Sequence, residues 1–450
     1  MREPKKKPDR REYLTQTPVP QLILRLSVPT IISMLVTAIY NGADTYFVGT
    51  ISTSATAAVG LVFSVMAIIQ AIGFFAGHGS GNCLSRALGA GNRKEAEEVA
   101  STGFALAIII GIVIAVLGNV FAEPLASFIG ATPSTMEDTV SYMRIILMGA
   151  PFMMCQFVIN NQLRFQGSAV YAMIGLLSGA IANVILDPVL IIGFDLGVAG
   201  AAIATIAGQL IGFIILYIGS RRGENLRIHA KDVHFNSRLL ISIVNGGAPS
   251  LFRQGLAAAS TLLLNHFAGD FGGDPAIAGM SVVSKVTMFM FSALIGFGQG
   301  YQPVCSFNYG AGLKSRVREG YIFCLKWGTI FLTLLGALCF IFAPEIVRFF
   351  RDDPEVVAVG EVALRCQAAV LPLCATIIMT NMMLQSIGRG IKASITSSAR
   401  NGIFFIPLIL ILPHFFDLTG VEITQTIADI LSFILAVPFA VSELRKMKEE

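Results

Sequence analysis

Apolar runs of about twenty residues recur along the whole chain, separated by short polar, glycine-rich or proline-containing breaks. A bilayer core of about 30 Å is crossed by about 20 helical residues. Backbone groups in lipid must be paired within their own segment, which favours helices, and the strict alternation typical of a barrel is absent. The pattern predicts an all-α, polytopic membrane protein with twelve transmembrane helices. These are expected near residues 26–48, 56–79, 97–120, 139–161, 170–193, 198–219, 240–266, 277–300, 321–343, 361–384, 393–413 and 420–441.

The composition agrees with a membrane bundle. Of the 450 residues, 54% are hydrophobic and only 13% are charged, against roughly 25% charged in soluble domains. The basic opening segment MREPKKKPDRRE is not followed by a short apolar core with a cleavage site, so we expect no removable signal peptide. The net charge of +4 is modest and is spread over loops, so no nucleic-acid partner is expected.

Lysine and arginine are concentrated in segments that the twelve spans place on one side of the membrane. The richest are the N-terminal segment and the linker 220–238; Arg164 and Arg400 are assigned to shorter loops on the same side. Positive residues favour the cytoplasmic side. The distribution therefore predicts that both termini are cytoplasmic.

The chain repeats itself at a shift of 221 residues. Each half then has six spans and enters the membrane in the same direction, so the two bundles should be pseudo-symmetric parallel repeats about the membrane normal. Matched pairs include Arg144 with Arg365, Pro151 with Pro372, and Asn160 with Asn381. The expected parts are a cytoplasmic segment 1–25, a six-helix bundle 26–219, a basic cytoplasmic linker 220–238, a second six-helix bundle 239–441 and a cytoplasmic tail 442–450.

A carboxylate lies in the first span, in the stretch YNGADTYFVG. A charged residue at the centre of a span costs about 2.5–3.5 kcal/mol, and such residues usually face the bundle interior. Thr37, Asn41 and Asp44 follow helical spacing, so they share one face. We interpret Asp44 as a functional carboxylate; the alternative is an interfacial residue with a purely structural role.

A second carboxylate lies in the fifth span, in IANVILDPVLIIG. Asn183 and Asp187 are four residues apart on one helical face, and Pro188 removes a backbone donor. Together they make an oxygen-rich site suited to a proton or a monovalent cation; a kink that the aspartate merely satisfies is the alternative. Further polar pairs at the same spacing are Gln156 with Asn160 and Thr205 with Gln209, which could equally join helices.

The second half shows no matching acidic set in its first or fourth span. It carries Arg253 and Lys285, which could line a cleft, pair with an acid or extend to an interface. Methionines such as Met153 could form an adaptable apolar wall, although most simply pack or face lipid. These residues are therefore weaker candidates for a substrate cleft.

Several classes of protein find no support in the sequence. There is no G-x-x-x-x-G-K-[ST] phosphate loop, no recognisable nucleophile and base, and no histidine or cysteine spacing typical of a metal site. The seven cysteines lie in or beside apolar segments and are expected to be small buried hydrophobes. Transport driven by an ion gradient is the simplest remaining class, with no enzymatic activity and no cofactor besides the coupling ion.

The stretches NGADTYFVG, SRALGAGNRKEAEE, NVILDP and GFGQGYQPVCSFNYGAG resemble the multidrug and toxic compound extrusion (MATE) family, especially its bacterial MepA-like and DinF-like members. The resemblance covers nearly the whole chain. It implies an antiporter of the bacterial inner membrane that expels small cationic, lipophilic compounds in exchange for H⁺ or Na⁺. A monomer is expected. It implies a coupling site at Asp44, Asn183, Asp187 and Thr205, the first three being the Na⁺ ligands if Na⁺ is the coupling ion.

Two alternatives stay open at this point. A flippase for a lipid-linked sugar or another amphipathic lipid would share the two-bundle architecture, with Arg253 and Lys285 facing a phosphate. A membrane-embedded enzyme would need a reactive constellation that the sequence does not offer.

Overall fold

The computed structural model describes residues 9–37 and 54–448 with their side chains, and the backbone of residues 38–49 and 53. The described chain is helical almost throughout, as predicted. Its elements are α1 (Arg10–Gln16), α2 (Val19–Gly49), α3 (Thr53–Gly89), α4 (Arg93–Val120), α5 (Ala122–Phe128), α6 (Met136–Phe165), α7 (Ala169–Pro188), η1 (Val189–Gly193), α8 (Gly197–Ser220), η2 (Ala230–Asp232), α9 (Ser237–Gly310), α10 (Lys314–Ile341), α11 (Ala343–Phe350), α12 (Pro354–Ser386), α13 (Gly390–Ser398), η3 (Ala399–Ile403) and α14 (Phe405–Lys446).

Two of these elements each contain two of the predicted membrane helices. α9 bends at Gly273, where φ is 65°, and α14 bends at Asp417, where φ is 49°. A positive φ interrupts a right-handed helix. With η1 continuing α7 and η3 continuing α13, the part of the chain that the structure describes contains the twelve long helices that the hydrophobic pattern predicts.

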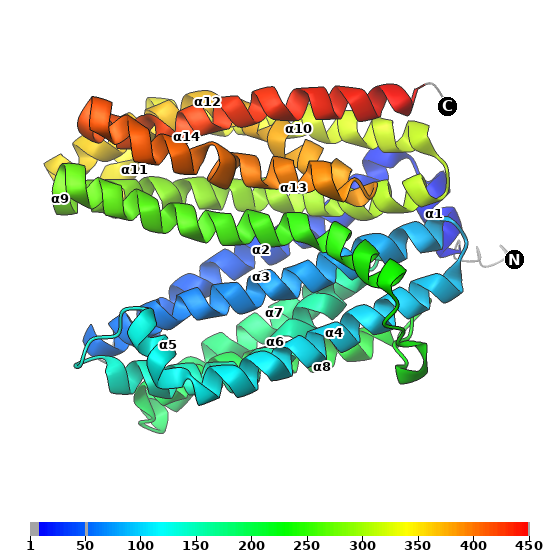
Figure 1. The fold of residues 1–450 in the computed structure, drawn as a ribbon, viewed down its shortest axis with the longest axis horizontal. Helices are drawn as coiled ribbons and strands as arrows, with labels where there is room; N and C mark the ends of the chain where they lie inside the picture. The colour runs from blue at the N-terminus through cyan, green and yellow to red at the C-terminus, as the bar shows by residue number, and fades with distance from the viewer. Residues whose placement is uncertain (1–8, 50–52, 449–450) are drawn as a thin grey trace, which may run out of the picture.

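The helices form two lobes that lie side by side (Figure 1). Helices α2 to α8 make the first lobe and α9 to α14 the second. The lobes repeat details as well as helices. Asn160 donates to the carbonyl of Ala172 at 2.8 Å, and its partner in the repeat, Asn381, donates to the carbonyl of Ala393 at 2.7 Å. The sequence repeat is therefore also a repeat of local structure.

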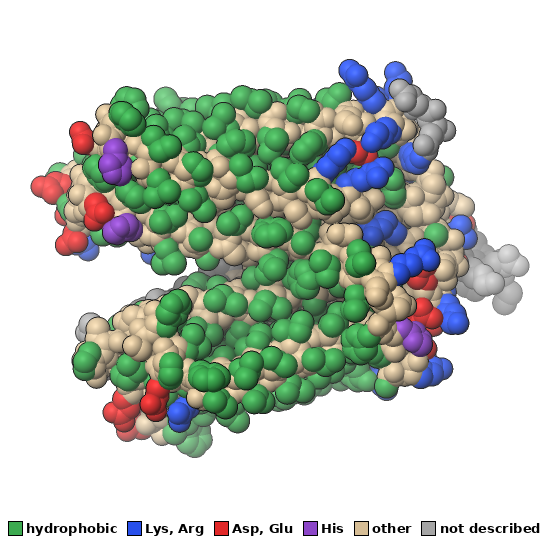
Figure 2. Space-filling model, in the orientation of Figure 1, with side chains coloured by type: hydrophobic (Ala, Val, Ile, Leu, Met, Phe, Trp, Pro, Cys, Tyr) green, Lys and Arg blue, Asp and Glu red, His purple; other side chains and the backbone are tan. Residues whose placement is uncertain are grey.

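The lobes are in contact near the end of the molecule that carries both termini and are separated by a cleft at the other end (Figure 2). Helix α2 packs on α9, where the Thr30 hydroxyl donates to the carbonyl of Gly296 at 2.6 Å and Ser27 donates to that of Phe297 at 3.0 Å. Near the termini, α3 and α9 end in a close crossing at Gly89 and Gly310. This contact closes one end of the space between the lobes.

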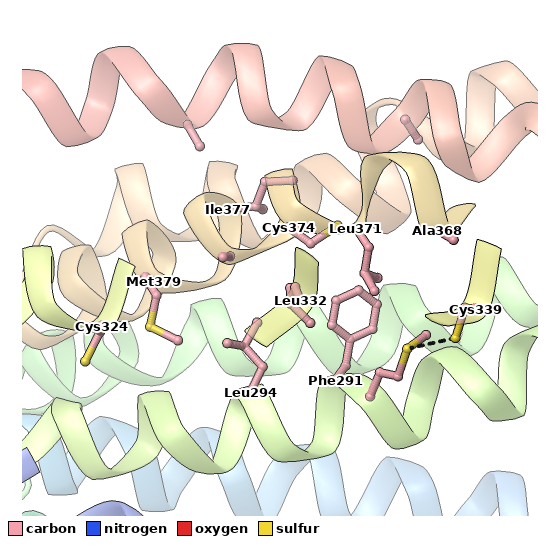
Figure 3. Packing of buried hydrophobic residues seen from close by; sticks show 14 of the residues in the cluster. Phe291, Leu294, Cys324, Leu332, Cys339, Ala368, Leu371, Cys374, Ile377 and Met379 are labelled. Carbon is pink, nitrogen blue, oxygen red and sulfur yellow. Dashed lines mark hydrogen bonds between the residues drawn. The ribbon is translucent and has the colours of Figure 1, made fainter. Parts of the chain in front are cut away.

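Apolar and sulfur-containing side chains fill the second lobe (Figure 3). Phe291 and Leu294 of α9 face Leu332 of α10 and Leu371 of α12 in one buried cluster. All seven cysteines are free thiols; six are buried and Cys366 is half-buried. The expectation of buried cysteines is confirmed for six of the seven.

A buried ion pair in the second lobe corrects the interpretation of Arg400 as a loop residue. Arg400 belongs to η3, within the eleventh membrane helix, and its Nε donates to Oδ1 of Asp429 at 2.7 Å. Asp429 is fully buried and also accepts from Gln425 at 2.9 Å and from the Cys374 thiol at 3.4 Å. The Arg400 guanidinium lies 4.2 Å from the ring centroid of Phe291. Asp429 lies in the last span of this half, outside the first and fourth spans for which no acidic set was predicted.

Removing one partner of this pair should destabilise the second lobe. Replacing Arg400 by Met leaves the Asp429 carboxylate buried without its cation, and breaking a buried pair in this way costs about 3–5 kcal/mol. We expect the purified Arg400→Met protein to unfold at a clearly lower temperature in detergent. The double variant Arg400→Met, Asp429→Leu removes both charges and should recover most of the loss; equal instability of the single and double variants would contradict this account.

Candidate functional site

A cavity of about 290 Å³ lies between the two lobes. Its walls come from α2, α3, α6, α7 and α8 of the first lobe and from α9 of the second. The volume is near the lower end of the range for small-molecule sites. Eight of the residues singled out from the sequence line it: Thr37, Met153, Gln156, Asn160, Asn183, Thr205, Gln209 and Arg253.

Three other candidates lie elsewhere or are not described. Lys285 is exposed and does not border this cavity. Asn41 and Asp44 belong to α2, but their side chains fall outside the described residues. The structure therefore brings together Thr37 of α2, the predicted residues of α6, α7 and α8 that line the cavity, and Arg253, and leaves Lys285 apart.

Asp187 lies one helical turn beyond the cavity-lining Asn183 on α7 and is fully buried. The Asn183 amide nitrogen lies 3.4 Å from its Oδ1, within hydrogen-bonding distance. Pro188 ends α7, and the chain continues as the π-helix η1. Because proline lacks an N–H, the regular hydrogen-bond ladder is interrupted there. The carboxylate thus lies at a break in the helix, next to the cavity.

Glycines hold α7 and α8 close together behind these side chains. A Cβ on Gly179 would lie 2.8 Å from the carbonyl oxygen of Gly208, and one on Gly208 would lie 2.7 Å from that of Gly179. Both distances are shorter than a Cβ atom tolerates, so only glycine allows this approach. The close contact brings Thr205 and Gln209 of α8 to the same wall as Asn183.

The residues of this wall carry buried acceptor oxygens. Gln156 Oε1, Asn183 Oδ1 and Gln209 Oε1 are buried, and none of them accepts a hydrogen bond from a described residue. A buried acceptor without a donor is costly. A bound cation, or a ligand group that carries N–H donors, would satisfy these oxygens.

Arg164 was missed as a site residue because its position near the end of a span suggested a loop. The structure places it inside α6, with 3% of its surface exposed, at the cavity. Its guanidinium donates to Gln299 of the other lobe, to Asn161 and to His78. A signal was available in the sequence, because Arg164 follows Asn160 at helical spacing on the same face.

The protonation of His78 follows from its two neighbours. Its Nε2 lies 3.1 Å from a terminal nitrogen of Arg164, and its Nδ1 lies 3.2 Å from the carbonyl of Phe74. Arginine has only donors and a carbonyl only acceptors. His78 is therefore neutral, with its proton on Nδ1, and adds no second charge beside Arg164.

Comparison with known proteins agrees with this architecture. The MatE family model matches residues 29–189 and 249–411, one segment in each lobe. The chain is similar to the multidrug export protein MepA of Staphylococcus haemolyticus, at 28% identity over 96% of this chain and 95% of that protein. It is also similar to MepA of Staphylococcus aureus, at 29% identity over 94% of each chain.

A solved structure has the same fold. The outward-facing conformation of a multidrug resistance MATE family transporter of the MOP superfamily superposes with a TM-score of 0.90 at 26% identity, covering 99% of this chain and 100% of that one. The family model covers well over half of the chain and falls on both lobes. This protein therefore belongs to the MatE family of multidrug export transporters, as the sequence motifs indicated.

Proposed function

We propose that the protein exports cationic, lipophilic compounds from a bacterial cell in exchange for H⁺ or Na⁺, by alternating access of the cavity between the lobes. The observation that carries this proposal is Asp187, a fully buried carboxylate hydrogen-bonded to the cavity-lining Asn183. A carboxylate at such depth is costly and is typically part of an ion pathway.

The charge distribution supports an outward-facing state. Lysine and arginine side chains gather at the end that carries the termini, whereas the opening between the lobes lies at the other end (Figure 2). An excess of positive residues favours a cytoplasmic location for the former end. The cavity then opens to the outside and is closed toward the cytoplasm by the crossing of α3 and α9.

Coupling requires that ion and drug stabilise different states. In the outward-facing state Asp187, together with Asp44 of α2, takes up H⁺ or Na⁺, and the neutralised carboxylates favour repacking of the first lobe and release of the drug. After ion release on the cytoplasmic side, the carboxylates and the amide oxygens of the wall attract the next cationic drug. If Na⁺ is the ion, Asp44, Asn183 and Asp187 supply its oxygen ligands.

The stoichiometry decides which driving force is used. A tenfold ion gradient is worth about 1.4 kcal/mol, and one charge crossing about 100 mV is worth about 2.3 kcal/mol. Exchange of one monovalent ion for one monovalent drug moves no net charge and uses the ion gradient alone. Two carboxylates allow a second ion, and the membrane voltage then contributes.

Efflux from vesicles tests the proposal. Purified protein is reconstituted into vesicles loaded with ethidium, and a pH gradient or a Na⁺ gradient is imposed separately, with the higher ion concentration outside. We expect ethidium to leave several times faster under one of the two gradients than without a gradient, and protein-free vesicles to show no acceleration. No acceleration under either gradient would contradict ion-coupled export.

A further inference from the structure

The cavity has a second charged region, which the proposed exchange of cations does not use. Arg164 of α6 and Arg253 of α9 both border it, so each lobe contributes one guanidinium. The described residues that line the cavity include neither aspartate nor glutamate. A cavity that served only cations would not be expected to carry two positive side chains.

Arg164 has no counterion among the residues whose side chains the structure describes. Its three hydrogen-bond partners, Gln299, Asn161 and His78, are all neutral. Its Nε is buried and has no acceptor among the described residues. Burying a charge without a partner of opposite sign is expensive, so an anionic group bound next to Arg164 would be stabilised.

Arg253 is the second guanidinium at the cavity. It is half-buried at the cavity and forms no hydrogen bond or ion pair with any described residue. A structural role in joining the lobes explains Arg164, which reaches Gln299 across the interface, but it does not explain Arg253. A bidentate guanidinium is well suited to a carboxylate or a phosphate.

The cavity therefore has two poles of opposite preference. Gln156, Asn183 and Gln209 carry acceptor oxygens, whereas Arg164 and Arg253 offer only donors. Gln156 and Arg164 lie on the same helix, eight residues apart, which at 1.5 Å per residue is about 12 Å. A ligand that satisfied both poles would carry a cation and an anion roughly 10 Å apart.

We propose that Arg164 and Arg253 form an anion-binding subsite, and that the preferred cargo is a small zwitterionic amphiphile whose cationic end lies on the amide wall and whose anionic end lies between the two guanidiniums. This inference rests on the proposed export function and narrows its substrate class. Arg164 also joins the lobes, so Arg253 is the residue to test.

A matched pair of ligands isolates the anionic end. The probes are a triphenylphosphonium cation with a carboxypentyl chain and the methyl ester of the same compound, titrated calorimetrically into the purified full-length protein. The variant is Arg253→Gln, with Arg253→Lys to retain the charge. Arg238→Gln removes an exposed cation from the same helix, outside the cavity, and serves as the control.

We expect Arg253→Gln to weaken binding of the carboxylate about tenfold or more, and to leave binding of the ester nearly unchanged. Arg253→Lys should show an intermediate loss and Arg238→Gln none. Equal weakening of both compounds, or wild-type protein that binds the carboxylate no better than the ester, would overturn the subsite. A soluble, monodisperse Arg253→Gln protein that still binds the ester shows that the fold is intact.

Two further measurements distinguish the anion-binding subsite from the proposed export function and from a site for a lipid phosphate. Export of the ester from vesicles by the wild type tests the proposed function independently. If the ester is exported but Arg253→Gln does not selectively lose carboxylate binding, the subsite alone is overturned. If Arg253→Gln selectively loses carboxylate binding but the ester is not exported, the transport function alone is contradicted.

Dihexanoylphosphatidylcholine, titrated in the same way, distinguishes the source of the anion. Binding that depends on Arg253 would assign the subsite to a lipid phosphate, and no binding would keep the small-molecule carboxylate.

Discussion

Replacing Asp187 by Asn is expected to abolish ion-driven export while leaving the protein folded. The amide has nearly the same shape as the carboxylate, and the neighbouring Asn183 can adjust its own amide to it. An amide, however, neither takes up a proton near neutral pH nor carries the charge that holds Na⁺. Export of ethidium under the effective gradient should fall to the level of protein-free vesicles, as measured by fluorescence.

The chain offers a matched control for this change eight residues away. Asp195 is exposed in the turn after η1 and has a φ of 52°, which asparagine adopts about as readily as aspartate. Asp195→Asn should therefore export normally. Asp187→Glu, which keeps the acid, should retain part of the activity. Full export by Asp187→Asn would refute the role proposed for this carboxylate.

The helical architecture could be predicted because lipid imposes a strong constraint on sequence. The twenty-residue apolar runs predicted twelve helices, and the repeat at a shift of 221 residues predicted two similar lobes. The bends fall where the hydrophobic pattern breaks: Gly273 lies between the predicted spans 240–266 and 277–300, and Asp417 lies between 393–413 and 420–441. The positive φ at Asp417, a residue other than glycine, has no counterpart in the sequence pattern.

The site was predictable only where its residues follow one another on a helix. Asn183 and Asp187 are four residues apart, and helical spacing alone indicates that they share a face. Arg164 depends instead on Gln299, which is distant in sequence and belongs to the other lobe. A contact between lobes leaves no periodic trace in one sequence, so the helical spacing of Arg164 after Asn160 indicates a shared face but not burial against the other lobe.

The same limitation applies to the second lobe. Asp429 is as deeply buried as Asp187, but it is paired with Arg400 from another helix. At the corresponding positions of the first lobe, 221 residues earlier, lie Gly208 and Gly179, whose backbones touch. One lobe therefore joins its last two helices through a charge pair and the other through a glycine contact. A fixed ion pair in the second lobe is consistent with coupling that is confined to the first.

A valine at Gly89 is expected to prevent the lobes from closing at the end that carries the termini. Gly89 ends α3 and Gly310 ends α9, and the two helix ends cross without space for a side chain. A Cβ on Gly89 would overlap the carbonyl oxygen of Phe307, which is backbone and cannot move aside. The Gly89→Val protein should lose the closed state shown here, and its export should fall to near background.

Cys83, a native thiol, can report on this opening without an introduced cysteine. It is buried on α3 against α9, where its thiol donates to the carbonyl of Ser242 at 3.2 Å. In Gly89→Val, a membrane-impermeant maleimide should modify Cys83 much faster than in the wild type, as located by peptide mass analysis. Gly60→Val makes the same change on the same helix, where a Cβ meets nothing within 4 Å, and should leave both labelling and export unchanged.

The pseudo-symmetry of the lobes gives a second variant for this test, because Gly310 is the repeat partner of Gly89. A Cβ on Gly310 would overlap the carbonyl oxygen of Arg86, just as one on Gly89 overlaps that of Phe307. Gly310→Val should therefore expose Cys83 and reduce export to the same extent as Gly89→Val. Because the two changes lie on different lobes but block the same contact, similar effects would indicate that the crossing closes the cavity. Normal export with a protected Cys83 in either variant would mean that it does not.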